Sequence, residues 1–403
     1  MPRSGEVSES YLRFATAAMR LHYGITMSPA TMAAKAELAR PDGFLTIEEP
    51  HLVAAAAVFP FEMTVAPGVT LPVSGIGDIA VSPNHRRRGS LGALMREHLD
   101  SASAHGDALS VLTASEAAIY GRYGYAPVTE AVSWSTSTGG LQLTGQAADG
   151  TVEVLDDPGD GTAVPEAFAA YQRRTPGELG RGPRWWTTRW RDPAAVGAPP
   201  DGFVALHRDA DGRPTGYATW SRGGAWTAYG GPAPVEVDEF VAADPGAARN
   251  LLAFFGSLDL CREVVLRNRP VLDPLRRHFA DIRRMRMVDR VDKLWARVLD
   301  VPRVVRACMG RLDRPVTIAV HDPGKTTDGC YTLAPDGDRV RCEPTGHRPD
   351  LTIDVADLTA CLLGAVSAAE LAGAGRLAGD RDALSAVARA LAAQVPPHCS
   401  TGF

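Results

Sequence analysis

The sequence predicts a mixed α/β protein made of two similar strand–turn–helix units and a third region in which strands precede helices. The first unit is indicated by an apolar run that ends at Val81, followed by helical spacing of apolar residues from Gly89. The second is indicated by a strand pattern at 235–242, followed by a helix pattern at 247–258. In the third region, a turn signal at 335–338 separates two short strand patterns. A chain of 403 residues is long enough for two or three such domains.

The first region is expected to span residues 1–150. Its predicted elements, in order, are helices within 9–40, strands at 44–47, 52–59 and up to Val81, a helix from Gly89, a strand at 108–114, a short helix at 115–123 and a strand at 128–136. No convincing strand pattern occurs in residues 1–8, so the edge of this sheet is expected to lack a strand there or to pair differently. The polar segment 137–151 is typical of a linker.

The second and third regions are expected at residues 151–288 and 289–403. The second region repeats the strand–turn–helix plan, but its turn contains Asp244 and Pro245. Because an acidic side chain repels phosphate and a proline removes an N–H donor, this second unit is predicted to have no phosphate site. The strand patterns of the third region are 293–298, 317–320, 330–333, 339–342 and 351–354.

Three arginines, Arg86, Arg87 and Arg88, lie in the turn between the strand that ends at Val81 and the helix that begins near Gly89. Free N–H groups at a helix start and the positive end of the helix dipole suit a phosphate, and arginine adds charge-assisted hydrogen bonds. The alternative is a solvated basic turn, which is the usual role of a short run of like charges. The strand–turn–helix context favours the anion site.

This turn resembles the coenzyme A loop of the GNAT acetyltransferase superfamily, whose pattern is Arg/Gln-x-x-Gly-x-Gly/Ala. Arg86, Gly89 and Leu91 stand at its positions, although Leu91 departs from the last one and Gly92 follows one residue late. The longer string, with Leu-Pro-x-x-Gly at 71–75, resembles one branch in particular, the Eis (enhanced intracellular survival) N-acetyltransferases.

The third region resembles the sterol-carrier-protein fold. The segments that carry this resemblance are 351–354, 357–363, 364–367 and 375–379, which in that family form a strand and then helices. The resemblance therefore covers nearly the whole chain, as two GNAT-like units, the second without a cofactor loop, and a sterol-carrier-like α+β domain.

The resemblance implies an acetyl-CoA-dependent N-acetyltransferase that needs no metal and transfers the acetyl group directly, through a tetrahedral intermediate. Its implied substrate is a small cationic amine, such as an aminoglycoside or a polyamine-like compound. A protein lysine acetyltransferase is the alternative enzyme, and a lipid-binding or scaffolding protein that uses the sterol-carrier-like domain is the non-enzymatic alternative. Residues 20–65, where an acceptor pocket is expected, carry no signature that would select among the substrates.

The cofactor site is expected to lie within the first strand–turn–helix unit. Backbone donors at a strand edge beside the thioester can polarise its carbonyl oxygen, and Ile79, Ala80 and Val81 are expected to supply them. The residues expected to hold the pyrophosphate are Arg87, Arg88, Gly89, Ser90, Leu91 and Gly92, and by resemblance Ser115 and Glu116 line the cofactor further along.

Tyr120 is the expected proton donor. The segment from Tyr120 to Gly124 and Tyr125 resembles the Tyr-x-x-x-Gly-Phe/Tyr element of the superfamily, with Tyr120 at the position of the acid. A phenol with a pKa of about 10 is protonated at neutral pH and can donate to a departing thiolate. The alternative is a tyrosine that only packs.

The expected proton acceptor is the chain's own terminal carboxylate. In the Eis family this carboxylate belongs to a terminal Phe, and the present chain ends in Phe403. The alternative is a frayed tail, which is the usual state of a terminus. Other carboxylates could act as the base, although no spacing singles one out: Glu37, Glu48, Glu49, Glu62 and Asp78.

Composition bounds the remaining possibilities. A net charge of -5 argues against a nucleic-acid-binding protein, and no stretch approaches the roughly 18 uncharged apolar residues of a membrane span. The six cysteines contain no Cys-x-x-Cys pair and are predicted to be free thiols in the reducing cytoplasm. The family resemblance further implies a homohexamer.

Overall fold

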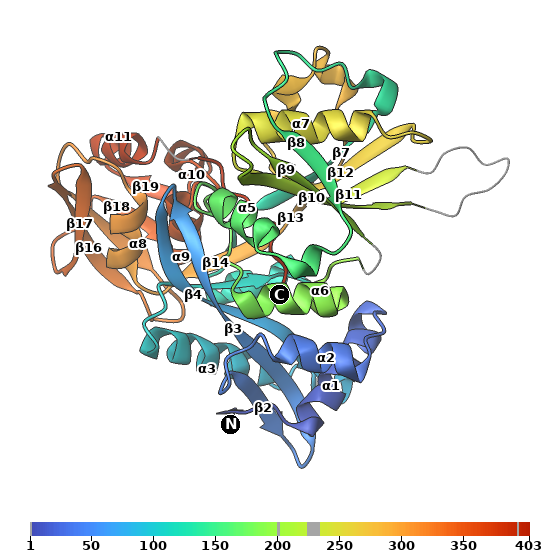
Figure 1. Cartoon of the computed structure of the whole chain (residues 1–403). Coiled ribbons are helices and arrows are strands. Elements are labelled where there is room, and N and C mark those ends of the chain that lie inside the picture. The colour runs from blue at the N-terminus through green and yellow to red at the C-terminus, as the bar shows by residue number, and fades with distance from the viewer. Residues whose placement is uncertain (1, 200–201, 224–233, 393–394) are drawn as a thin grey trace. The chain divides into compact units, whose positions relative to one another are not determined.

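The computed structural model describes residues 2–199, 202–223, 234–392 and 395–403, which form two compact units (Figure 1). The first unit contains residues 1–129, 293–397 and Phe403, and the second contains residues 130–292 and 398–402. The chain therefore passes between units at Thr129 and Lys293, whereas composition suggested divisions at 150 and 288.

The first unit is built on a seven-stranded sheet with the order β1-β2-β3-β4-β5-β14-β6. Its strands are β1 (Arg3–Gly5), β2 (Phe44–Glu48), β3 (Leu52–Ala66), β4 (Val69–Val81), β5 (Leu109–Thr113), β14 (Leu294–Val298) and β6 (Ala126–Pro127). Only the pair β4 and β5 is parallel, and the helix α3 (Ser90–Ala104) connects these two strands. Of the two alternatives for residues 1–8, a missing edge strand is excluded, because β1 pairs with β2. At three residues β1 is too short to show an apolar alternation.

The alternation of side chains along β3 gives the sheet of the first unit two apolar faces. Ala54, Ala56 and Val58 belong to the core under α3, together with Leu94 and Met95 of that helix. The intervening residues Ala55, Ala57 and Phe59 belong to the core under α1 (Glu9–Tyr23) and α2 (Pro29–Ala36). The prediction of one or two helices within residues 9–40 is thus confirmed, with two present. The small alanines of β3 let helices pack closely on both faces.

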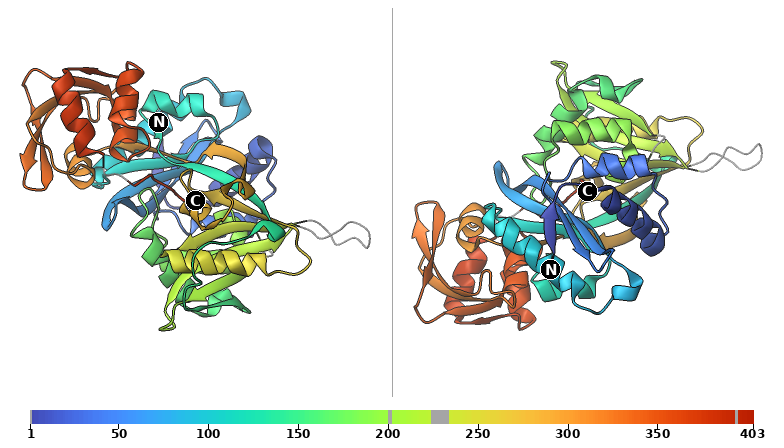
Figure 2. Two further views of the ribbon diagram at one scale, coloured as in Figure 1. Left: turned by 90° about the horizontal axis from the view of Figure 1, so that it is seen from above. Right: turned by 90° about the horizontal axis from the view of Figure 1, so that it is seen from below.

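The second unit repeats this plan in a sheet with the order β13-β7-β12-β11-β10-β9-β8. Its strands are β7 (Glu130–Ser137), β8 (Thr151–Leu155), β9 (Phe203–Arg208), β10 (Pro214–Arg222), β11 (Val235–Ala242), β12 (Glu263–Arg269) and β13 (Arg286–Asp292). Here β11 and β12 are the parallel pair, connected by α7 (Pro245–Gly256), which lies along one face of the sheet (Figure 2). Ala218 and Trp220 of β10 pack in the core under α7. Tyr217 points to the other face, where it contacts Trp186 of α6 (Pro183–Arg191).

The second unit is an insertion into the first, between β6 and β14. The strand predicted at 128–136 is β7, which pairs with β12 and β13 rather than with the first sheet. The strand predicted at 293–298 is β14, which pairs with β5 and β6 rather than with the third region. Both strand positions were predicted correctly, but their assignment to regions was wrong. An apolar or alternating pattern identifies a strand without identifying its partner, because pairing is non-local.

The C-terminal part of the first unit is a five-stranded sheet with helices, in the order β17-β16-β15-β18-β19. Its elements are α8 (Val301–Cys308), β15 (Val316–His321), β16 (Gly329–Asp336), β17 (Arg339–Thr345), β18 (Leu351–Asp354), α9 (Val355–Leu362), α10 (Ala368–Gly373), β19 (Leu377–Gly379) and α11 (Arg381–Ala390). The predicted hairpin of β16 and β17, and the strand β18 followed by helices, are confirmed.

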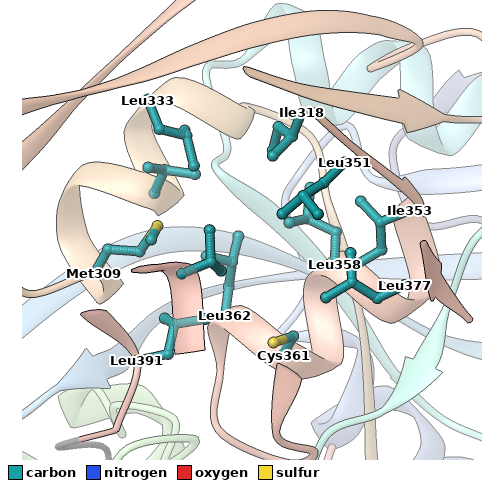
Figure 3. Close-up of a pocket in the computed structure, with 12 residues that line it drawn as sticks. Met309, Ile318, Leu333, Leu351, Ile353, Leu358, Cys361, Leu362, Leu377 and Leu391 are labelled. Carbon is teal, nitrogen blue, oxygen red and sulfur yellow. The ribbon is translucent and has the colours of Figure 1, made fainter. Parts of the chain in front are cut away.

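An apolar cavity of about 30 Å³ lies in this C-terminal part (Figure 3). Its lining includes Ile318 of β15, Ile353 of β18 and Leu358 of α9, whose side chains point toward one another. Such a volume is on the order of that of a single water molecule. A sterol or an acyl chain would therefore enter only if the surrounding side chains moved apart.

Candidate active site

The parallel pairing of β4 with β5 stops well before β4 ends. The register pairs Val73 with Leu109 and continues only to Gly75 opposite Val111, whereas β4 runs on to Val81. On its other side, β4 stays paired with β3 up to Val81, but with one extra residue between the partners of Ala55 and Ala57. This bulge contains Asp78, whose φ of 51° is in the left-handed region. The backbone of residues 79–81 therefore follows a bulge and lies beyond the described ladder with β5.

The loop after β4 is shaped to receive an anion. Arg87 has a φ of 62° and Gly89 a φ of 88°, so two nearby residues adopt the left-handed conformation. Gly89 is the N-cap of α3 and has no side chain that could accept from the first-turn amides. The amides of Ser90, Leu91 and Gly92 are thus available to a ligand, and the side chains of Arg87 and Arg88 are exposed beside them. The loop accordingly fits a pyrophosphate.

The corresponding helix start in the second unit is closed by its own acidic residue. Asp244 is the N-cap of α7, and its carboxylate accepts from the backbone N–H of Ala247 at 2.9 Å. A negative charge therefore occupies the position at which Gly89 leaves the amides of α3 open. The two units share a fold but differ in the chemistry of this turn.

Tyr120 is the last residue of α4 (Ala117–Tyr120), and it is 6% exposed. Its ring meets that of Tyr125 edge-on, at 6.5 Å between centroids. Burial raises the pKa of Tyr120 to about 12, although a hydrogen bond with the Ser115 side chain acts in the opposite direction. Ser115 and Glu116 themselves are exposed, and the proximity of Glu116 contributes to the rise in pKa. The Tyr120 phenol is therefore buried and keeps its proton at neutral pH.

A buried arginine fixes the backbone that follows Tyr120. Arg297 of β14 has no exposed side-chain surface, and it donates both to the carbonyl oxygen of Tyr123 and, at 2.8 Å, to Asp322. The next residue, Gly124, has a φ of 79°, and a Cβ there would lie 2.8 Å from Val355 and 2.9 Å from Arg297. Arg297 belongs to no sequence motif. The feature of the sequence that could have identified it is a single charged residue in the otherwise apolar run 294–298.

The terminal residue, Phe403, packs on the face of the first sheet that is covered by α1 and α2. Its ring centroid lies 5.0 Å from that of Phe61 and 5.7 Å from that of Phe59. Gly75 and Gly77 of β4 leave the space that it occupies, since a Cβ on Gly75 would lie 2.9 Å from the ring. Phe403 is thus ordered against the strand that ends in residues 79–81.

The other carboxylates that could act as a base have different surroundings. Asp78 accepts from Lys35 Nζ at 2.5 Å, and both side chains are less than a tenth exposed. Burial, together with the charge of Asp78, raises the pKa of Tyr11 well above its usual value. Glu48, Glu49 and Glu62 are exposed, and Glu37 is the C-cap of α2. Asp78 is therefore engaged in a buried ion pair.

Within residues 2–199, 202–223, 234–392 and 395–403, no three His, Cys, Asp or Glu side chains are grouped so that they could hold a metal ion. None of the helices in the same ranges is long and apolar enough to cross a membrane.

Comparison with known proteins identifies three parts of this chain. Residues 6–128 and residues 177–298 each match an acetyltransferase (GNAT) domain, and residues 301–400 match a sterol carrier protein domain. An uncharacterised N-acetyltransferase of Streptomyces coelicolor is 33% identical over 378 residues, which cover 91% of each chain. The chain thus consists of two GNAT domains followed by a sterol-carrier domain, and it is an N-acetyltransferase.

Relatives with a name narrow the assignment. The N-acetyltransferase Eis of Mycobacterium tuberculosis is 27% identical over 397 residues, covering 94% of this chain and 93% of its own. The crystal structure of Eis1 from Mycobacterium abscessus matches all of both chains with a TM-score of 0.86 and 26% identity. A GCN5-related N-acetyltransferase from Anabaena variabilis, at 18% identity and a TM-score of 0.85, shares the fold. The three-part architecture, the loop before α3 and these relatives agree: the chain belongs to the Eis family of GNAT N-acetyltransferases.

Proposed function

We propose that this enzyme transfers the acetyl group of acetyl-CoA to a small cationic amine, an aminoglycoside or a polyamine-like compound. Tyr120 is the proton donor in this proposal, and the terminal carboxylate of Phe403 is the proton acceptor. The observation that carries it is the packing of the Phe403 ring against Gly75 and Gly77 of β4. A frayed tail would make no such contact.

The proposed cofactor site consists of the end of β4, the loop and the start of α3. Ile79, Ala80 and Val81 supply backbone donors, and Ser115 and Glu116 line the cofactor further along. The left-handed Arg87 and Gly89 support the proposal, because they turn the loop so that uncapped amides and exposed guanidinium groups lie together. The remaining members are Arg88, Ser90, Leu91 and Gly92.

Acetyl-CoA supplies an acetyl group activated as a thioester. In the proposed reaction, the Phe403 carboxylate takes a proton from the substrate ammonium, which frees the nitrogen lone pair. The nitrogen–carbon bond forms and the carbon–sulfur bond breaks. Tyr120 then gives its proton to the departing sulfur. The acetylated nitrogen loses a second proton, which restores the Tyr120 phenol, and the proton on the carboxyl group passes to solvent, so that charge and protons balance.

The weak basicity of the acceptor is the chemical difficulty of this proposal, since an α-carboxyl group has a pKa of about 3.5. Burial in general raises the pKa of a carboxyl group, and the negative charge of a carboxylate also holds a cationic amine in place. The same charge is why a cationic substrate is proposed rather than a neutral or anionic one. A cytoplasmic location and a homohexamer stay predictions.

One added residue tests the proposal. A chain extended by a single Gly after Phe403 moves the carboxylate away while the Phe ring stays, so turnover should fall to background with acetyl-CoA affinity unchanged. The matched control is Phe403→Leu, which keeps a terminal carboxylate and an apolar anchor. Full activity of the extended enzyme would return the search to Asp78, Glu37 and Glu62.

The substrate class is tested in the same assay. Initial rates with acetyl-CoA are measured across aminoglycosides, polyamines and lysine peptides. Turnover of the small amines is the expected result, whereas turnover of lysine peptides alone would assign the enzyme to the protein lysine acetyltransferases.

A further inference from the structure

Glu178, in the second unit, is a fully buried carboxylate that is almost surrounded by the chain's own tail. Its two oxygens accept from the N–H of Ser400 at 2.8 Å and the N–H of Thr401 at 3.2 Å. The hydroxyl groups of the same residues donate to it at 2.8 and 2.7 Å. The thiol of Cys399 lies 3.7 Å from one oxygen. Glu178 therefore contacts the backbone and side chains of Ser400 and Thr401 and the thiol of Cys399.

Arg181 completes this tail clamp, by which we mean Glu178 and Arg181. Its guanidinium donates to Thr401 Oγ1 at 3.0 Å and to Ser400 Oγ at 3.1 Å. The group lies 3.9 Å from the ring centroid of Phe168 and 4.2 Å from that of Trp185, and its side chain is 1% exposed. Burial alone would lower the pKa of Arg181, but nearby Glu239 more than offsets this and holds the pKa above its usual value. The clamp thus has one fixed negative and one fixed positive group.

The clamp depends on the tail as much as the tail depends on the clamp. A buried carboxylate is stable only when donors satisfy its oxygens. Apart from the N–H of Leu179 at 3.1 Å, the donors that the structure gives Glu178 all belong to residues 399–401. Departure of the tail would therefore leave the Glu178 oxygens short of hydrogen-bond donors in the interior, which favours the docked state.

We infer that the tail clamp of the second GNAT unit positions the terminal carboxylate for catalysis, an inference that rests on the function proposed above. Only Gly402 separates Thr401 from Phe403, and the indole N–H of Trp185 donates to the Gly402 carbonyl at 3.4 Å. Fixing residues 399–402 leaves the last residue few conformations. The second unit, whose helix start is closed by Asp244, thereby has a role in acetyl transfer through Glu178 and Arg181, which act as positioning residues.

Glu178→Gln is the most informative variant. It keeps the shape of the side chain but replaces one of the two accepting oxygens by a donating NH₂ group. A glutamine has one accepting oxygen, and its NH₂ group would face two donors of Ser400 or of Thr401. The matched control is Glu153→Gln in the same unit, which removes an exposed ion pair with Arg208. Both purified variants are compared with the full-length wild type.

The first measurement is the release of Phe403 by a carboxypeptidase, followed by intact mass. Glu178→Gln should speed this release by about tenfold or more, the factor expected for one lost charge-assisted hydrogen bond. Glu153→Gln should match the wild type. An unchanged release rate in Glu178→Gln overturns the inference.

A second pair of variants acts from the tail and guards against misfolding of Glu178→Gln. Thr401→Val removes the hydroxyl that donates to Glu178, and Thr401→Ser keeps it. Thr401→Val should speed release and lower kcat with the KM for acetyl-CoA unchanged, whereas Thr401→Ser should restore both to near the wild type. A merely structural role predicts no selective fall in kcat, so the unchanged KM for acetyl-CoA separates the two roles.

Kinetics separate failure of this inference from failure of the proposed function. If Thr401→Val or Glu178→Gln releases Phe403 faster but keeps its kcat, while the enzyme extended after Phe403 is inactive, the inference is overturned and the proposed function stands. If the extended enzyme is fully active, the proposed function fails. A faster release together with a lower kcat in both variants supports the inference.

Discussion

Tyr120 keeps its proton throughout the pH range in which amines are acetylated, because burial raises its pKa to about 12. The neutral phenol, which is the form that can donate, predominates below that pKa. The rate should therefore rise with pH as the amine loses its proton, without an alkaline fall due to Tyr120 below about pH 10. An alkaline limb near pH 8–9 in the wild type would contradict this assignment.

Removing the hydroxyl tests the same residue directly. Tyr120→Phe keeps the ring that meets Tyr125, so the fold and the affinity for acetyl-CoA should survive. Loss of a general acid lowers turnover by about 10²–10⁴-fold, and we expect kcat to fall within that range. The control is Tyr331→Phe, which removes a buried hydroxyl in the third sheet and should leave kcat unchanged. Wild-type turnover in Tyr120→Phe would mean that the proton comes from elsewhere.

At this scale, residues that belong to a local motif could be predicted from the sequence, and residues defined by distant partners could not. Tyr120 was singled out by the spacing to Gly124 and Tyr125. Glu178 carries no motif, because its partners are more than two hundred positions away along the chain. The same holds for Arg297, whose significance depends on Asp322 and on the backbone of Tyr123.

At the scale of elements, β14 connects two sheets of the first unit. Its Arg297 forms an ion pair with Asp322 in the loop after β15. Asp322 accepts this guanidinium and also the backbone N–H groups of Gly324 and Thr327, at 2.9 Å each. The ion pair has no exposed surface on either side chain. Its loss would leave a charge unpaired in the interior.

Asp322→Asn is the matching test. The change keeps the shape of the side chain but removes its charge, so we expect a loss of about 3–5 kcal/mol of unfolding free energy, as for other broken buried pairs. Asp313→Asn is the control, because its pair with Arg389 is exposed and should contribute less than about 1 kcal/mol. Urea denaturation of both variants gives the comparison. Equal midpoints for Asp322→Asn and the wild type would show that the pair does not stabilise the unit.

The elements show where sequence patterns succeed. The turn at 82–89 and the helix after it were predicted because Pro, Gly and helical spacing act locally. The strands β7 and β14 were predicted in place but with no partners, because partners are chosen by tertiary packing. The short β1 was not predicted, because its three residues pair with β2 through backbone hydrogen bonds and show no side-chain pattern.

At the scale of the whole molecule, the two GNAT units differ in the N-cap of the helix that would bind phosphate. Gly89 leaves the start of α3 open, and Asp244 closes the start of α7 with a carboxylate. One acetyl-CoA should therefore bind per chain, in the first unit, and titration calorimetry gives this number. A stoichiometry of two would contradict the assignment.

The arginines should account for much of that binding. Arg87→Ala combined with Arg88→Ala should weaken it strongly, because each lost bond to a phosphate contributes about 1.5–3 kcal/mol. Arg283→Ala combined with Arg284→Ala removes two neighbouring exposed arginines of the second unit and should leave the affinity unchanged. Equal affinities for the two double variants would place the phosphates away from the loop.

The insertion of the second unit also dictates an order of events during synthesis. The backbone N–H of Lys293 donates to the carbonyl of Thr129 at 2.9 Å, and Glu130 is the register partner of Asp292. The chain therefore leaves the first unit and returns to it at one point. Because the ribosome makes the N-terminal end first, the edge of β5 that pairs with β14 stays unpaired until all of residues 130–292 have been made. The sheet of the inserted unit can form meanwhile, since its strands are contiguous in the chain. Glu178 of that unit, however, gains most of its donors only when residues 399–401 have been made. The nascent enzyme can therefore form the sheet of its second unit before that of its first, but both units await residues 398–403 for completion.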